Sequence, residues 1–106
     1  MKIGFVLPCY NEYENIFILI NQIKKIFKNS TIIVIDDSKL DTIKKKIKKK
    51  GNIKYVKRKT KSGRGSAVLL GMKKILNDKN INLVVEMDTD LSSHPKELKK
   101  NTKIFL

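Results

Sequence analysis

The chain has 106 residues, 41% of them hydrophobic, and it carries 24 Lys and Arg against 10 Asp and Glu, a formal charge of +14 at pH 7. This length predicts one compact domain over residues 1–106. No apolar run approaches the roughly 20 residues of a membrane-spanning helix, and none is long enough for a secretory signal. The single cysteine, Cys9, excludes an internal disulfide framework and fits a cytoplasmic, reducing location.

The excess of positive charge favours anionic partners, namely nucleic acid, anionic lipid or a phosphate-bearing substrate. Most of this charge comes from lysine, whereas arginine is the usual residue for bidentate recognition of bases and phosphates. We therefore expect no nucleic-acid partner, and we expect peripheral contact with the cytoplasmic face of a membrane only as a secondary role. A non-catalytic basic module that binds nucleic acid or anionic membrane is the alternative from another functional class, and steep salt dependence would identify it.

The first strand is predicted at residues 2–7, an apolar run that Pro8 closes. A helix should follow, because apolar residues then recur at spacings of three and four, as one face of a helix requires. These residues are Ile16, Leu19, Ile20, Ile23, Ile26 and Phe27. Asn11 is the expected N-cap of this helix, and Asn29 and Ser30 should end it.

The second strand is predicted at residues 31–35 and the third at residues 53–56, both from short apolar runs. A lysine-rich helix should lie between them. In this helix Ile43 and Ile47 share the inner face, and the lysines within residues 44–50 form a solvated outer face. Contact of this outer face with lipid headgroups is the weaker alternative.

A third helix should begin at residues 63–66, which follow a basic loop. The fourth strand is predicted at residues 81–87, and another helix can begin at Pro95. This alternation predicts an α/β fold with three α/β/α layers around a mostly parallel, Rossmann-like sheet. Ligands of open α/β sheets bind at the carboxyl ends of the strands, so the polar loops there should form one site.

Two carboxylates separated by one residue, Asp88 and Asp90, directly follow the fourth strand. If the extended geometry continues, both side chains leave the chain on the same side. Hard oxygen donors at a strand end suit a divalent cation such as Mg²⁺, which commonly also binds the phosphates of a substrate. Taken alone, residues 88–90 could instead form an ordinary turn at the end of the strand, because Asp is a common turn residue.

Two further polar segments follow predicted strands. Asp36 and Asp37 point to opposite faces, so one of them can face a ligand while the other braces the loop. A carboxylate here can accept hydrogen bonds from a ribose or a base, and capping of the next helix is an equal alternative. Gly63 and Gly65 lie in a basic segment, so their loop either approaches a phosphate or simply permits tight packing.

Taken together and in order, four segments resemble motifs of the nucleotide-sugar-dependent glycosyltransferases of family 2, whose fold is the GT-A type. The segments are residues 8–12 (Pro-Cys-Tyr-Asn-Glu), 35–41 (Ile-Asp-Asp-Ser-Lys-Leu-Asp), 58–71 with its Gly-Arg-Gly-Ser-Ala, and 88–90 (Asp-Thr-Asp). Within this family, residues 87–95 are most similar to the dolichol-phosphate mannose synthases. The resemblance implies a GT-A nucleotide-sugar-binding half that covers essentially the whole chain.

The resemblance also implies roles for individual residues. Those implied to bind the nucleotide sugar are Pro8, Tyr10, Glu12, Ile35, Asp37, Asp88, Thr89 and Asp90. The residues implied to bind Mg²⁺ or Mn²⁺ are Asp88, Asp90 and Ser92, and Asp90 is the implied catalytic residue. Two positions depart from the family pattern: Lys39 replaces a usual Ser, and Ser92 replaces a Gln that binds metal in some members.

The activity implied by the resemblance is inverting, metal-dependent transfer of a sugar to a polyprenyl or dolichyl phosphate. GDP-mannose is the favoured donor. The alternative within the family is another nucleotide sugar of the UDP-glucose type, with a saccharide or lipid acceptor. The enzymes that the chain resembles are much longer, and the chain ends soon after the metal motif. We therefore expect it to be a truncated or split enzyme that binds the donor but transfers no sugar alone.

Overall fold

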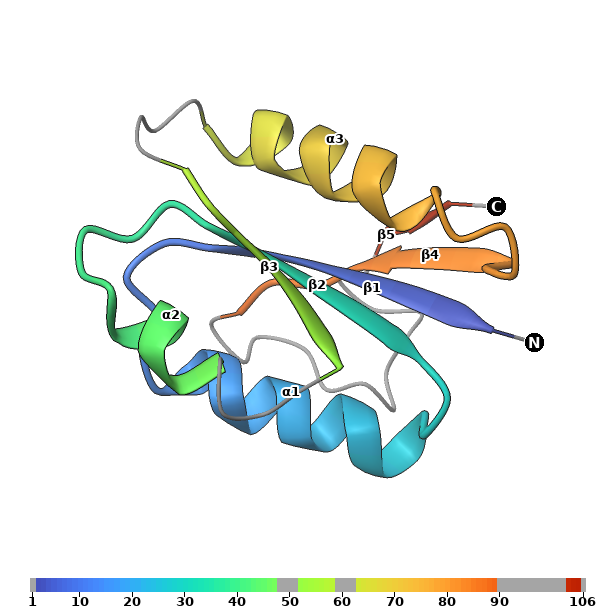
Figure 1. Ribbon diagram of the computed structural model, residues 1–106, viewed down its shortest axis with the longest axis horizontal. Helices are drawn as coiled ribbons and strands as arrows, with labels where there is room; N and C mark the ends of the chain where they lie inside the picture. The colour runs from blue at the N-terminus through green and yellow to red at the C-terminus, as the bar shows by residue number, and fades with distance from the viewer. Residues whose placement is uncertain (1, 48–51, 59–62, 90–102, 106) are drawn as a thin grey trace.

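The structure is a computed structural model that describes residues 2–47, 52–58, 63–89 and 103–105. Strands and helices alternate along the chain up to the fourth strand, as predicted (Figure 1). The elements in chain order are β1 (Ile3–Cys9), α1 (Asn15–Ile26), β2 (Thr31–Asp36), α2 (Thr42–Ile47), β3 (Ile53–Lys57), α3 (Arg64–Ile75), β4 (Leu83–Glu86) and β5 (Lys103–Phe105).

The strands form one sheet in the order β3-β2-β1-β4-β5. Strands β1 to β4 pair in parallel, with Val6 of β1 opposite Ile33 of β2 and Glu86 of β4. Strand β5 pairs with β4 in the antiparallel direction, and the sequence patterns did not predict this strand. The predicted mostly parallel sheet is thus confirmed, and the carboxyl ends of its four parallel strands lie at one edge. The helix predicted from Pro95 lies outside the described residues.

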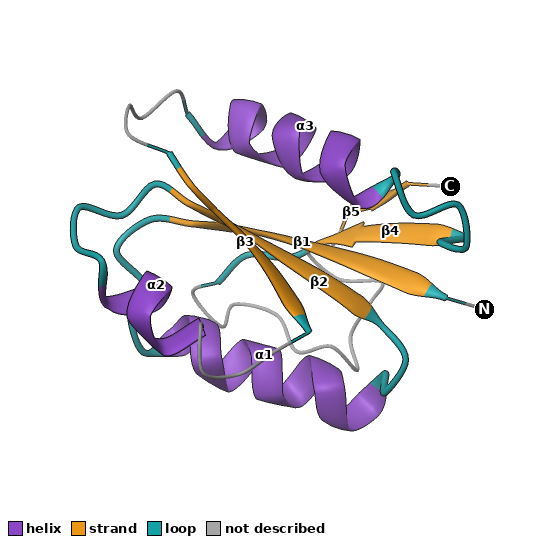
Figure 2. Cartoon of the chain, viewed as in Figure 1, coloured by secondary structure: helices purple, strands orange, loops and turns teal. Residues whose placement is uncertain are grey.

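Helices α1 and α2 cover one face of the sheet and α3 covers the other, which confirms the predicted three layers (Figure 2). The core beneath α1 and α2 is the larger, and its fully buried members include Phe5, Leu7, Ile16, Leu19, Ile20, Ile23, Ile32, Val34 and Ile43. The core beneath α3 contains Val6, Ile33, Ile35, Ala67, Ile75 and Val84. Each fully buried aliphatic side chain stabilises the fold by roughly 1.5–3 kcal/mol, so the apolar stripes account for the layer arrangement.

Helix α3 approaches the sheet most closely at Gly71. A Cβ atom at this position would lie 2.5 Å from Cγ1 of Val6 and 3.3 Å from Cγ1 of Ile35. Only a residue without a side chain therefore fits between α3 and the centre of the sheet. This close approach places the amino end of α3 next to the carboxyl ends of β1 and β2.

The expectation that Asn11 caps the first helix is wrong. Helix α1 begins after Glu14, and Asn11 lies earlier in the loop with a left-handed backbone, φ 58°. Its side chain bonds to another loop instead.

The inner face predicted for the lysine-rich helix is confirmed, because Ile43 and Ile47 are both buried. Within the described ranges, no helix has the length and apolar character needed to cross a bilayer.

Candidate functional site

Hydrogen bonds join the loop that follows β1 to the loop that follows β2. The main-chain N–H of Asn11 donates to Oγ of Ser38 at 2.7 Å, and that of Lys39 donates to Oδ1 of Asn11 at 3.1 Å. Oη of Tyr13 donates to the same Oδ1 at 2.7 Å and accepts from the main-chain N–H of Leu40 at 3.2 Å. Because Lys39 contributes only its backbone to this link, the link is compatible with lysine at that position.

Asp36, the last residue of β2, stabilises the end of this strand from inside the protein. Its side chain is fully buried, and it accepts hydrogen bonds from the main-chain N–H of Ser38 at 2.8 Å and from Oη of Tyr55 at 2.6 Å. Nζ of Lys57 lies 3.8 Å from the same carboxylate. Burial, and then the bond to Asp36, raise the pKa of Tyr55, so this phenol stays protonated. One of the two acids after β2 therefore has a structural role.

Asp37, the second of the two acidic residues, forms a bidentate ion pair with Arg58. Nε and Nη2 of Arg58 donate to the two carboxylate oxygens at 2.6 and 2.5 Å, and this pairing raises the pKa of Arg58. The same guanidinium also donates to Oγ of Ser66 at 2.8 Å and to the carbonyl oxygen of Gly63 at 3.0 Å. Arg58 thus ties the end of β2 to the beginning of α3.

A pocket of about 280 Å³ lies between these loops and α3. It is lined by Pro8, Cys9, Tyr10, Asp37, Arg64 and Ala67. Tyr10 is 42% exposed, and it brings an aromatic ring to the pocket lining. Asp37 contributes acceptor oxygens and Arg64 contributes a cation. An aromatic face, a carboxylate and a guanidinium around one small pocket are suited to a ligand that combines a ring, hydroxyl groups and an anion.

Arg64 connects this pocket to the end of β4. Its Nη2 forms ion pairs with the carboxylates of both Glu86 and Asp88. The Glu86 side chain is buried, whereas that of Asp88 is 37% exposed. The two residues are two positions apart in the sequence, and both side chains reach the same guanidinium. Two carboxyl groups thus share one guanidinium at this point of the site.

The carboxylates at the end of β4 fit a divalent cation. Both are hard oxygen donors of the kind that Mg²⁺ and Mn²⁺ bind, and they already hold one positive charge, that of Arg64. Within the part of the chain that the structure describes, no three His, Cys, Asp or Glu residues form a metal-binding cluster. The other implied ligands, Asp90 and Ser92, lie outside the described residues.

Three other residues implied by the sequence, Thr89, Glu12 and Ile35, are not among those that line the pocket. Oγ1 of Thr89, which is buried, donates to the carbonyl oxygen of Pro8 at 3.3 Å and joins the chain after β4 to β1. Glu12 accepts a hydrogen bond from Nδ2 of Asn15 at 3.1 Å, at the beginning of α1. The side chain of Ile35 is fully buried against α3, so it supports the pocket from below and does not line it.

The structure thus brings Pro8, Tyr10 and Asp37 into one pocket, and Arg64 links that pocket to Asp88. Sequence reasoning did not identify Arg64 as a site residue. Its position between two glycines at the amino end of a predicted helix was the available signal. No pattern in the sequence indicated which carboxylates it would reach.

Comparison with known proteins was made on both sequence and structure. The profile of the family named Glycosyl transferase family 2 matches residues 5–105. The dolichol-phosphate mannosyltransferase of Pyrococcus furiosus is 34% identical over an alignment of 103 residues, and the match covers 92% of this chain and 28% of that protein. The undecaprenyl-phosphate mannosyltransferase of Micrococcus luteus is 26% identical over an alignment of 102 residues, and the match covers 92% of this chain and 42% of that protein. The chain spans less than half the length of these relatives.

Solved structures with the same fold include TarS of S. aureus in complex with UDP. Its TM-score is 0.68 at 28% identity, over 85% of this chain and 28% of that one. A second neighbour is glucosyl-3-phosphoglycerate synthase of Mycobacterium tuberculosis, in complex with Mn²⁺, UDP-glucose and phosphoglyceric acid. Its TM-score is 0.62 at 25% identity, and the match covers 89% of this chain and 35% of that one. These neighbours confirm the predicted GT-A fold. With the family profile matching nearly all its residues, the chain belongs to glycosyl transferase family 2.

Proposed function

We propose that the chain is the donor-binding half of a metal-dependent glycosyltransferase that transfers mannose, with inversion, from GDP-mannose to a polyprenyl phosphate. The observation that carries the proposal is the arrangement of Tyr10, Asp37, Arg64 and Asp88 around one edge of the sheet. The names of the relatives from Pyrococcus furiosus and Micrococcus luteus support mannose as the sugar and a polyprenyl phosphate as the acceptor. A position at the cytoplasmic face of a membrane is part of the proposal.

Each residue of the pocket has a proposed part in binding the donor. The ring of Tyr10 packs against the base or ribose, and the free lone pairs of the Asp37 carboxylate accept a ribose hydroxyl or a base N–H. Pro8, Glu12, Ile35 and Thr89 shape the surrounding loops or touch the nucleotide with main-chain atoms. Asp88, Asp90 and Ser92 hold the cation, and Asp90 is the proposed catalytic residue. The cation, when bound, neutralises charge on the leaving diphosphate.

The proposed acceptor, a phosphate monoester, can react without a general base, so it suits a site that mainly binds and positions its substrates. A phosphate monoester has a second pKa near 6, so at neutral pH it is largely dianionic and already nucleophilic. A sugar hydroxyl would instead need a carboxylate to remove its proton. A polyprenyl phosphate therefore requires no general base from the donor-binding half, where positioning and charge neutralisation suffice.

A donor with a uridine nucleotide is the second candidate. Two structural neighbours with at least 25% identity carry UDP or UDP-glucose, and one of them also carries Mn²⁺. The acceptor would then be a saccharide or a lipid. The pocket residues described above serve either base, because a stacking ring and a carboxylate acceptor do not by themselves select guanine over uracil.

Calorimetric titration of the chain with GDP, GDP-mannose, UDP and UDP-glucose, each with and without MnCl₂, tests the proposal. We expect guanine nucleotides to bind tighter than uracil nucleotides, and only when metal is present. Asp88→Asn should weaken the metal-dependent binding by roughly tenfold or more, while Lys73→Gln, on the exposed side of α3, should leave it unchanged. Preference for uracil would select the second candidate, and failure of all four ligands to bind with metal would overturn both.

A further inference from the structure

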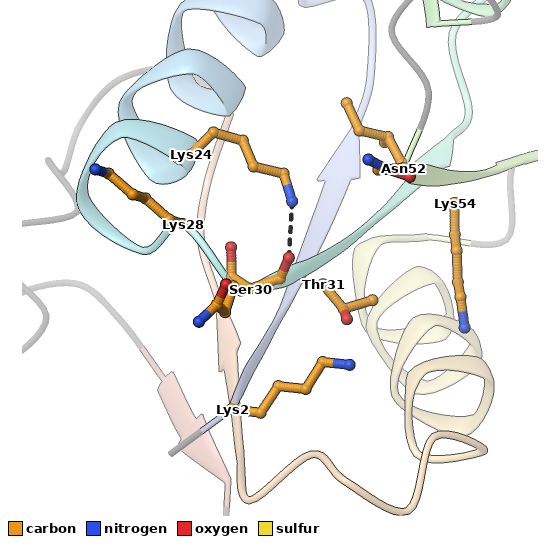
Figure 3. Close-up of a pocket in the computed structure, with 9 residues that line it drawn as sticks. Lys2, Lys24, Lys28, Ser30, Thr31, Asn52 and Lys54 are labelled. Atoms are coloured by element: carbon orange, nitrogen blue, oxygen red, sulfur yellow. Dashed lines mark hydrogen bonds between the residues drawn. The ribbon is translucent and has the colours of Figure 1, made fainter.

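A second pocket, of about 420 Å³, opens at the opposite edge of the sheet, where the parallel strands begin (Figure 3). Lys2, Lys24, Lys28 and Lys54 line it, and we call it the lysine pocket. We propose that the lysine pocket is a second, non-catalytic site that binds a phosphate group, either of a small free anion or of a lipid headgroup. This inference does not depend on the proposed transferase activity.

The lysines of this pocket come from separate parts of the chain. Lys2 precedes β1, Lys24 lies in the last turn of α1, Lys28 follows α1, and Lys54 lies in β3. A lysine in the last turn of a helix complements the helix dipole. Nζ of Lys24 also donates to the carbonyl oxygen of Ser30, beyond the end of α1, at 2.7 Å (Figure 3). Helix capping does not explain why Lys2 and Lys54 converge on the same hollow.

The positive charge of the lysine pocket is only partly neutralised. Nζ of Lys2 lies 2.8 Å from Oδ2 of Asp78, and this bond lowers the pKa of Asp78, with a smaller contribution from Lys54. Asp78 therefore offsets one of the four ammonium groups. Burial, followed by repulsion from Lys2, lowers the pKa of Lys24. An anion bound among them would relieve this repulsion.

Ser30 supplies a second kind of donor in the wall of the pocket. The residue is 8% exposed, and its Oγ has no hydrogen-bond partner among the described residues. A buried hydroxyl without a partner is unfavourable, so such groups commonly mark the place of a bound water, ion or ligand. Phosphate oxygens accept strongly from both ammonium and hydroxyl donors. The charge and the unsatisfied hydroxyl thus point to the same ligand class.

The first test is a titration of the ¹⁵N-labelled chain with pyrophosphate in the absence of divalent metal, followed by amide shifts. Saturating shifts should appear at Lys24, Ser30 and Lys54, away from Tyr10 and Asp37. In a parallel arm, the chain is sedimented with phosphatidylcholine vesicles that either contain or lack phosphatidylglycerol. A saturable pyrophosphate site identifies a free anion as the source of the phosphate, whereas binding to the anionic vesicles alone identifies a lipid headgroup.

Charge-matched variants separate this site from the general positive charge of the chain. The double variant Lys28→Gln/Lys54→Gln should lose about fivefold in affinity for each lysine removed, whereas Lys44→Gln/Lys73→Gln, with the same net charge, should lose little. Asp78→Asn should tighten binding because it removes the opposing carboxylate. The proposal fails if both double variants lose affinity equally, or if neither probe binds. Titration of GDP with Mn²⁺ should give the same result for both double variants, which keeps this test independent of the proposed donor site.

Discussion

Arg58 and Asp37 are joined by two hydrogen bonds of 2.6 and 2.5 Å, in a pair whose side chains are only 12% and 7% exposed. Because Arg58 also donates to the carbonyl oxygen of Gly63, this pair fixes the beginning of α3 relative to the end of β2. Asp37 and two residues near the beginning of α3, Arg64 and Ala67, line the same pocket. The shape of the candidate donor site therefore depends on a contact that lies mostly beneath its surface.

Removing this cation should destabilise the fold. Arg58→Ala leaves the nearly buried carboxylate of Asp37 without its partner, and we expect the free energy of unfolding in urea to fall by about 3 kcal/mol. Arg58→Lys keeps the charge but not the two-pronged geometry, so it should recover only part of the loss. If Arg58→Ala lowered the free energy of unfolding by less than about 1 kcal/mol, the pair would be behaving as a surface ion pair that solvent screens.

Arg64 should compete with a divalent cation for the carboxylate of Asp88. Its guanidinium pairs with Asp88 and with the neighbouring Glu86, so it must move away from Asp88 before an ion binds that carboxylate. Arg64→Gln should therefore tighten Mn²⁺ binding by about tenfold, as expected when one competing charge is removed. The electron paramagnetic resonance signal of free Mn²⁺ measures this, with Lys73→Gln as the control on the same helix. Unchanged or weaker binding would show that Arg64 does not occupy the cation position.

Two glycines of α3 should respond oppositely to substitution by alanine. A Cβ at Gly71 would collide with Val6, so Gly71→Ala should lower the free energy of unfolding by about 1–3 kcal/mol. A Cβ at Gly65 would meet nothing within 4 Å, so Gly65→Ala should raise it by about 0.5–1 kcal/mol through helix propensity. Urea denaturation compares the two variants. A neutral Gly71→Ala would mean that α3 packs less closely on β1.

The ion pair of Lys2 with Asp78 should give a defined pH dependence. The pair lowers the pKa of Asp78 below its ordinary 3.8, so its stabilisation is complete above that value and is lost as the pH falls through the lowered pKa. Asp78→Asn should unfold more easily than the parent chain at pH 7, and this difference should shrink below pH 3.8. Asparagine keeps the Oδ1 that accepts from the main-chain N–H of Asn80, so the turn is preserved. A difference that is constant with pH would exclude the ion pair as its cause.

Elements with a clear hydrophobic period were predictable from the sequence. Ile43 and Ile47 are buried as predicted, because such side chains can leave water on only one face of a helix. Of the six residues of the predicted stripe in the first helix, Ile16, Leu19, Ile20 and Ile23 are buried. Ile26 is only half-buried, and so is Phe27, which lies just beyond the end of α1. Strand β5 was not predictable, since its three residues show no period and it exists through pairing with distant β4. Ile81 was predicted to begin the fourth strand, but it lies in the turn before β4, where its N–H donates to the carbonyl oxygen of Asp78.

The candidate site was predictable where it follows from topology. Parallel strands bring their carboxyl ends together, and this places Tyr10 and Asp37 in one pocket. The partners of the acidic residues were not predictable, because many basic residues are available and only the folded loops decide which of them reaches a given carboxylate. Asn11 illustrates this limit: a typical capping residue in a typical position bonds across to the next loop instead.

The central claim is that the carboxyl ends of β1, β2 and β4 form one site for a nucleoside diphosphate and its cation. Amide shifts of the ¹⁵N-labelled chain during titration with GDP in the presence of Mg²⁺ test it most directly. The account predicts that Tyr10, Asp37 and Thr89 shift together along one binding curve, while Lys24 and Lys54 do not move. Shifts that follow separate curves, or that avoid these three residues, would contradict it.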